Sequence, residues 1–406
     1  MALTPSTTVW LVLSAKAIRT FCYGYLGVLI PLHLAALGLG AGGIGVAVTL
    51  TLGASAALTL LARRPAERHG GRIVLMALAW LIAAAGVLLA TARVPALVVL
   101  AAMLGNVAVS MGETGPFLSI EQVLVARASA GGSLTMRMSL YNLVGYAASG
   151  LGALTVAALP GGRHADGAGA TGLGGDGVLF WLFALSGVVQ VLLYARLPDT
   201  PVAPAAAGPR HFPSRRLIYR IAALFALDSF AGGFVLQSLM VYWLYAHFAL
   251  TPGVIGTVVF AAQVLTACSV LLAVQGSHWF GLVNTMVFSH LLSNVFLIAM
   301  GLAPTAGLAV AFLLLRALLS QMDVPTRQAF LMLVVHDDER EAMATVTNAG
   351  RTVAQAVSPA LTGYLMQAVS LSAPFVLGGG LKIVYDLLLY RTCRGVVPVS
   401  ARERAG

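Results

Sequence analysis

The chain has 406 residues, of which 59% are hydrophobic and only 9% are charged, and its mean hydropathy is +0.90. A soluble domain of this length does not have such a composition, so the sequence predicts a polytopic membrane protein. The formal net charge of +10 does not indicate a nucleic-acid-binding protein, because basic residues in cytoplasmic loops explain it better.

Apolar segments long enough to cross a bilayer, which takes about 20 residues, recur along the whole chain. The first is too long and too charged for a cleavable signal peptide, so we expect it to be retained as a membrane helix. The three cysteines show no disulfide or metal-ligand spacing, and we expect no cofactor. In chain order we expect twelve spans, at residues 8–37, 42–62, 73–91, 96–119, 137–159, 178–197, 217–248, 254–275, 282–302, 305–326, 343–367 and 373–391.

The basic residues are distributed unevenly between alternate loops. With the N-terminus inside, 17 of the 24 fall in cytoplasmic loops or the span ends beside them, and only Arg93 and Arg163 fall in external loops. This asymmetry predicts a multi-pass protein of the cytoplasmic (inner) membrane with both termini in the cytoplasm. The other five lie inside spans: Lys16, Arg19, Arg316, Arg351 and Lys382.

The longest internal connection, residues 198–216, is rich in Pro and Ala and is basic, which is typical of a flexible cytoplasmic linker. It separates a six-helix bundle at 1–197 from a second one, with a short tail, at 217–406. The two halves also repeat, because Arg19–Gly24 aligns with Asp228–Gly233 at an offset of 209 residues. Further matches are Ile44 with Ile255, Pro116 with Pro325, and Asn142 with Asn348.

Several spans carry polar residues on one helical face. In the first span, Lys16, Arg19 and Tyr23 follow at i, i+3 and i+7. An ionised group at bilayer depth costs at least ~2.5–3.5 kcal/mol, so this face should contact protein or a wet cavity. Similar faces mark the spans at 96–119, 137–159, 217–248, 305–326 and 343–367, the last with Asn348, Arg351 and Gln355.

Depth in the membrane sorts the charged residues into two sets. Counted from the span ends at about 1.5 Å per residue, Arg19, Asp228 and Arg316 lie near the midplane, where a substrate site is expected. Glu113 and Asp323 lie near the cytoplasmic face, which suits a gate or a structural ion network.

Arg19 and Asp228 occupy equivalent places in the two halves, and we expect them to face each other. They form either a substrate site with one cationic and one anionic group or a fixed ion pair between the halves. Arg316 is a second cationic candidate, because arginine binds carboxylate and phosphate groups bidentately. The alternative for Arg316 is a buried side chain bonded to backbone carbonyls. Arg351 and Gln355 are expected to flank the same cavity.

Glu113, Asp323 and Asp228 are the candidates for proton coupling, because a carboxyl group removed from water holds its proton more tightly. The alternative for Glu113 and Asp323 is structural pairing with cytoplasmic arginines such as Arg327.

Four further polar residues in the last part of the chain are expected to be structural. Lys382 and Asp386 are four residues apart and should pair with each other on a peripheral helix. His290 and Asn294 are expected to form hydrogen bonds between helices rather than to bind a ligand.

The segment at 63–72, RRPAERHGGR, is similar to the signature loop between the second and third spans of the major facilitator superfamily, roughly Gly-x-x-x-Asp-Arg-x-Gly-Arg. Glu67 stands in place of the acid, and Arg68 and Gly70 match. The equivalent segment of the second half, 276–281, lacks both the acid and the arginine. The twelve spans, the basic central loop and the duplicated halves extend this resemblance over the whole chain.

The resemblance implies an all-α membrane protein with twelve transmembrane helices in two pseudo-symmetric six-helix bundles around a central cavity. In that family the first, fourth, seventh and tenth spans line the cavity, and the third, sixth, ninth and twelfth pack outside. The loop that holds Glu67 and Arg68 would then contribute to a gate.

The function that we expect is secondary active transport of a small solute by alternating access, with the proton as coupling ion and a monomer as the working form. An organic anion is one substrate class that the arginines would accept. The alternative is a multidrug or toxic-compound efflux pump, although the fifth span lacks the Gly-Pro of the drug/proton antiporters. An integral membrane enzyme would need a clustered nucleophile and base, and a transport-silent sensor would need a signalling domain; the sequence shows neither. It also lacks a nucleotide-binding P-loop, so ATP is not the direct energy source.

Overall fold

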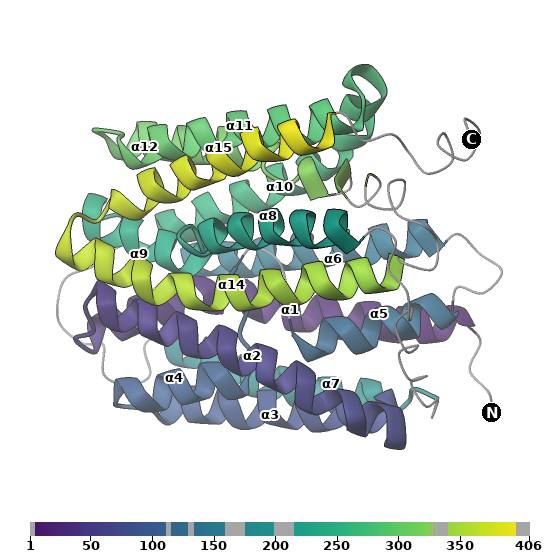
Figure 1. Cartoon of the computed structure of the whole chain (residues 1–406). Coiled ribbons are helices and arrows are strands. Elements are labelled where there is room, and N and C mark those ends of the chain that lie inside the picture. The colour runs from purple at the N-terminus through teal and green to yellow at the C-terminus, as the bar shows by residue number, and fades with distance from the viewer. Residues whose placement is uncertain are drawn as a thin grey trace, which may run out of the picture. The chain divides into compact units, whose positions relative to one another are not determined.

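The computed structural model describes residues 5–110, 115–128, 134–158, 175–198, 215–324, 326–327, 330 and 340–394, and these residues form helices and no strands (Figure 1). The all-α class is therefore confirmed. The helices of the first part are α1 (Pro5–Ala36), α2 (Ala41–His69), α3 (Gly71–Thr91), α4 (Pro95–Leu104), α5 (Pro116–Ala128), α6 (Leu134–Thr155) and α7 (Gly175–Tyr194). Those of the second part are α8 (Arg215–Gly233), α9 (Gln237–Phe248), α10 (Pro252–Phe280), α11 (Leu282–Gly301), α12 (Ala306–Leu319), α14 (Arg340–Ala368) and α15 (Ala373–Cys393).

Nine helical segments among the described residues are long and apolar enough to cross a membrane. Two shorter apolar helices, Pro95–Leu104 and Ala306–Leu319, lie where further spans were expected. The total of twelve spans stays a prediction.

The expected span at 96–119 is not one helix. It consists of α4 and α5, and between them Gly105 and Asn106 form a turn in which Asn106 has a left-handed backbone (φ 48°). Gly115, with φ 106°, precedes Pro116, the first residue of α5. Glu113 lies outside the described residues.

The expected span at 217–248 is interrupted too. α8 ends at Gly233, where the backbone N–H groups of Phe234 and Val235 donate back to Ala231 and Gly232, and α9 begins at Gln237. The paired glycines Gly232 and Gly233 have low helix propensity, which favours a break here. The expected span at 305–326 likewise contains a shorter helix, α12, that ends at Leu319.

Contacts along the chain group it into two compact units. Unit 1 is Met1–Pro204 with Leu236–Gln263, and unit 2 is Ala205–Val235 with Val264–Gly406. Within unit 1, α1 packs along α6 and α3 along α7; within unit 2, α8 packs along α14 and α11 along α15. The predicted domain boundaries at 197 and 217 place α9 in the second half, whereas this grouping places it in unit 1. The predicted boundaries stay a prediction.

Glycine contacts reveal the internal repeat within each unit. A Cβ on Gly24 of α1 would lie 1.9 Å from the carbonyl oxygen of Ser149 on α6, and a Cβ on Gly233 of α8 would lie 1.7 Å from Oγ of Ser358 on α14. The offset of 209 residues relates the two contacts: it leads from Gly24 to Gly233 and from Ser149 to Ser358. At this offset Asn142 corresponds to Arg351, not to Asn348, so the expected alignment in that span is wrong by three residues.

Candidate functional site

Unit 1 holds a buried ion pair between Arg19 on α1 and Glu121 on α5. Both side chains are fully buried, at 0% exposure. Nη1 of Arg19 donates to Oε1 of Glu121 at 3.0 Å and Nη2 donates to Oε2 at 2.7 Å, so the pair is bidentate.

Two tyrosines and a glutamine complete this pair. The hydroxyls of Tyr194 and Tyr141 donate to Glu121 at 2.5 and 2.7 Å. Nη1 of Arg19 also donates to Gln190 and Tyr194 on α7, at 3.3 and 2.7 Å. The carboxylate therefore accepts bonds from three different helices, as a buried charge requires.

Sequence reasoning missed Glu121 because it placed the end of the span at residue 119. The signal was present: Phe117, Ile120 and Leu124 continue the apolar helical period around the glutamate and are buried. Extending the helix through them would have put Glu121 inside the protein.

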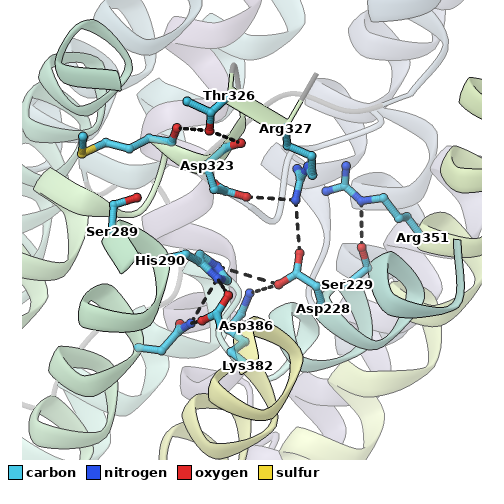
Figure 2. Close-up of polar contacts among 12 residues, drawn as sticks. Asp228, Ser229, Ser289, His290, Asp323, Thr326, Arg327, Arg351, Lys382 and Asp386 are labelled. Carbon is cyan, nitrogen blue, oxygen red and sulfur yellow. Dashed lines mark hydrogen bonds and ion pairs between the residues drawn. The ribbon is translucent and has the colours of Figure 1, made fainter. Parts of the chain in front are cut away.

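Unit 2 holds a larger buried cluster around Asp228 of α8 (Figure 2). Nζ of Lys382 lies 2.6 Å from Oδ1 of Asp228, and Nε2 of His290 lies 3.8 Å from the same oxygen. Nη1 of Arg327 lies 3.6 Å from Oδ2. One carboxylate thus faces three basic side chains.

Two more carboxylates belong to the same cluster. Asp323 pairs with Arg327 at 2.9 Å, and Oδ1 of Asp386 lies 2.7 Å from Nδ1 of His290. The side-chain amide of Asn294 donates to Oδ2 of Asp386 at 3.0 Å. Figure 2 shows the three carboxylates arranged around the His290 ring and the Arg327 guanidinium.

The cluster confirms one structural prediction and overturns another. His290 and Asn294, one turn apart on α11, do form hydrogen bonds to another helix, namely to Asp386 on α15. Lys382 and Asp386 do not pair with each other as expected, because Lys382 reaches Asp228 and Asp386 reaches His290. A polar face of α15 therefore contacts protein.

The two clusters occupy equivalent positions in the repeat. Gly187 on α7 packs on α3, and Gly379 on α15 packs on α11, which relates these helices by an offset of 379 − 187 = 192. The same offset relates Gln190 to Lys382 and Tyr194 to Asp386. In each unit, a charged residue of the first helix contacts the same repeat position on the last helix. Arg19 on α1 contacts Gln190 on α7, and Asp228 on α8 contacts Lys382 on α15.

Arg19 and Asp228 each have ionic partners within their own unit, and that the two residues face each other stays a prediction. Arg19 has its carboxylate partner, Glu121, within unit 1, and Asp228 has its cationic partners, Lys382 and Arg327, within unit 2. Arg327 contacts both Asp228 and Asp323, so it joins a residue expected near the midplane to one expected near the cytoplasmic face. The alternative of structural pairing between Asp323 and Arg327 is confirmed.

The remaining candidates differ in burial. The Tyr23 hydroxyl donates to the carbonyl of Gly105 at 3.0 Å, where α4 ends. Arg351 is half-buried and donates to Oγ of Ser229 at 2.9 Å, while Gln355 is half-buried and Asn348 is exposed. Of these last three, Arg351 lies beside the Asp228 cluster, because its charge interacts with Asp228 and Asp323.

Arg316 lies on α12 and is half-buried. Its backbone carbonyl accepts a bond from Ser293, but its buried Nε has no hydrogen-bond partner among the described residues. The alternative of a guanidinium bonded to backbone carbonyls is therefore not seen at this atom.

The loop residues Glu67 and Arg68 lie at the end of α2. Glu67 pairs with Arg63 one turn earlier at 3.0 Å, and Arg68 is exposed. Their role as a gate stays a prediction. In the part of the chain that the structure describes, no group of three His, Cys, Asp or Glu side chains could hold a metal ion.

Comparison with known proteins bears on the fold. No protein-family model matches the chain. It is 24% identical to an uncharacterized membrane protein of Saccharomyces cerevisiae, over 92% of this chain and 91% of that one.

Solved structures match nearly the whole chain. The xylose transporter XylE from E. coli has a TM-score of 0.73 at 13% identity, covering 97% of this chain and 98% of that one. The human organic anion transporter MFSD10 has a TM-score of 0.67 at 16% identity, covering 96% and 100%. The nucleoside transporter NupG has a TM-score of 0.70 at 14% identity, covering 95% and 98%. The chain is an all-α, multi-pass membrane protein with the fold of the major facilitator superfamily transporters.

Proposed function

We propose that this protein is a secondary active transporter that moves a small organic solute across the cytoplasmic membrane by alternating access. The observation that carries the proposal is the cluster around Asp228, where three carboxylates and three basic side chains lie buried on helices of a membrane protein. Ionisable groups are costly inside a membrane and mark solute or ion pathways when they occur there. That the similar solved structures are transporters supports this function over an enzymatic one.

Arg316 supports an organic anion as the substrate class. A buried guanidinium nitrogen without a hydrogen-bond partner in the described residues can donate to a carboxylate or phosphate of a solute. Arg351, held by Ser229 through Nε, is a second candidate donor.

A thermal-shift screen of purified protein against anionic, cationic and neutral metabolites tests the substrate class. A ligand that binds the folded state raises the melting temperature by mass action, and only anions should do so. Arg316→Gln should abolish that shift, whereas Arg316→Lys, which keeps the charge but loses the planar donor pair, should weaken it. A shift produced only by neutral or cationic solutes would overturn the anion assignment.

Proton coupling is proposed because the Asp228 cluster contains carboxylates and a histidine, which exchange protons. An imposed pH gradient should drive accumulation of the selected anion in proteoliposomes. Transport that ignores the pH gradient and follows a sodium gradient would contradict proton coupling.

A further inference from the structure

His290 lies between two carboxylates that come from different helices. Its Nδ1 is 2.7 Å from Oδ1 of Asp386 on α15, and its Nε2 is 3.8 Å from Oδ1 of Asp228 on α8. All three side chains are buried, His290 at 6% exposure. An imidazole that carries protons on both nitrogens can donate to both carboxylates, whereas the neutral ring can donate to only one.

The net charge of these six side chains changes from −1 to zero when His290 binds one proton. With a neutral ring, Asp228, Asp323 and Asp386 contribute three negative charges, and Arg327 and Lys382 contribute two positive ones. A protonated ring brings the buried cluster to three of each, which is the arrangement that a low-dielectric site favours.

Other polar and charged side chains lie around the His290 ring. On α15, Lys382 and the edge of the Tyr385 ring face His290 beside Asp386. Asn294 donates to Asp386 and so keeps that carboxylate in place. Arg316 on α12 contributes a backbone carbonyl to Ser293. Arg351 on α14 is half-buried and bonded to Ser229, and its positive charge interacts with Asp228 and Asp323 from outside the six buried side chains counted above.

We infer that His290, held between Asp386 and Asp228, is the binding site of the coupling proton, an inference that rests on the proposed transport function. The proton arrives from water on the open side and binds Nε2. The same proton is later released to water on the other side of the membrane, so the step needs no other reactant. While it is bound, Asp228 faces the imidazolium as well as Lys382; after its release, Oδ1 of Asp228 is held by Lys382 alone.

This site differs from the sequence-based candidates for coupling, which were carboxylates only. From the sequence, His290 is expected to form a structural hydrogen bond between helices rather than to bind a ligand. The structure places its ring at the junction of α8, α11 and α15, next to the buried carboxylate that belongs to the first helix of the second repeat.

NMR of protein labelled with ¹⁵N-histidine in nanodiscs tests proton binding directly and needs no transported solute. One ring should change protonation between about pH 5 and pH 9, vanish from the spectrum in His290→Gln, and remain in His278→Gln, a matched control at the exposed end of α10. Asp386→Asn, which keeps the shape of the side chain but removes the negative charge beside Nδ1, should lower the midpoint of that ring.

A ring that is lost in His290→Gln but keeps one protonation state throughout would overturn the inference, and so would an unchanged midpoint in Asp386→Asn. If His290→Gln does not fold, the ring is identified as the one that moves in Asp386→Asn. If the titration overturns the role of His290, the proposed transport function is unaffected, because the titration does not measure transport.

Transport then tests whether this proton is the coupling proton. With the anion selected by the thermal-shift screen, His290→Gln should lose accumulation driven by a pH gradient yet retain exchange of labelled for unlabelled solute at equal pH. His278→Gln should retain both. Accumulation by His290→Gln at the wild-type level would overturn the coupling role, whereas a wild-type protein that transports nothing would overturn the proposed function itself.

Discussion

Lys382 and Asp228 form an ion pair of 2.6 Å between α15 and α8, with both side chains buried. The two residues are 154 positions apart in the sequence, and the pair joins the last helix of the second repeat to its first. It is the counterpart of the contact between Gln190 and Arg19 in unit 1.

Removing one partner of this pair should destabilise the protein more than removing both. Lys382→Met leaves the Asp228 carboxylate buried with only its longer contacts to Arg327 and His290, and it should cost at most about 3–5 kcal/mol of unfolding free energy. Lys382→Met with Asp228→Leu should cost less. Chemical unfolding in detergent micelles measures these differences. Strictly additive effects of the two substitutions would show that the pair does not contribute to stability.

Arg19 should be energetically coupled to Glu121 and not to Asp228. A double-mutant cycle with Arg19→Met and Glu121→Gln should give a coupling energy of about 0.5–3 kcal/mol, because the two residues share two hydrogen bonds. The cycle of Arg19→Met with Asp228→Asn should be additive within about 0.5 kcal/mol, because each residue has its ionic partners within its own unit. The reverse ranking of the two coupling energies would favour the fixed ion pair between Arg19 and Asp228 that the sequence left as one of two alternatives.

Gly233 should not tolerate a side chain, in contrast to its neighbour. Gly233→Ala would bring Cβ to 1.7 Å from Oγ of Ser358 and should cost about 1–3 kcal/mol through overpacking of α8 against α14. Gly232→Ala is the matched control, because its nearest neighbour, Nζ of Lys382, is 3.8 Å away.

Thermal unfolding of the two variants gives the comparison. Equal melting temperatures for Gly232→Ala and Gly233→Ala would contradict the close packing of α8 on α14. Adding Ser358→Ala should recover part of the loss in Gly233→Ala, since it removes the oxygen nearest to the added methyl group.

The predicted membrane orientation can be tested by cysteine labelling. On a background without Cys22, Cys268 and Cys393, single cysteines at Ala205 and Ala168 should label from opposite sides of the membrane. The reason is the excess of basic residues in the loops expected to be cytoplasmic. Both positions lie outside the described residues. Labelling of both by an impermeant reagent added to intact cells would exclude this orientation.

Much of the fold could be read from apolar periodicity, because a span in lipid must be a continuous run of apolar residues that satisfies its own backbone. Interruptions within spans are harder to read. α4 ends next to Asn106, which has a left-handed backbone, and α8 ends at Gly233, which packs against Ser358. Neither that backbone conformation nor that contact is visible along the chain.

The candidate site was predicted only in part for a related reason. Which residues are charged inside the membrane follows from the sequence, so Arg19, Asp228, Asp323 and Arg327 were identified. Apart from the pair Asp323–Arg327, which is four residues apart on one helix face, their partners were not identified, because a side chain's partner depends on how helices distant in sequence pack. Depth counted along separate helices cannot show that Arg327 reaches Asp228.

The sequence by itself determined that the chain is a helical membrane protein, that it is internally duplicated, and that it carries ionisable residues inside its spans. The reason is that hydrophobic length, repeat offset and charge are properties of the chain alone. Only the tertiary structure decided that Glu121 neutralises Arg19, that Lys382 reaches Asp228 and that His290 stands between two carboxylates. A buried charge takes whichever partner the packing of helices brings within about 4 Å, and that packing is a property of the folded protein.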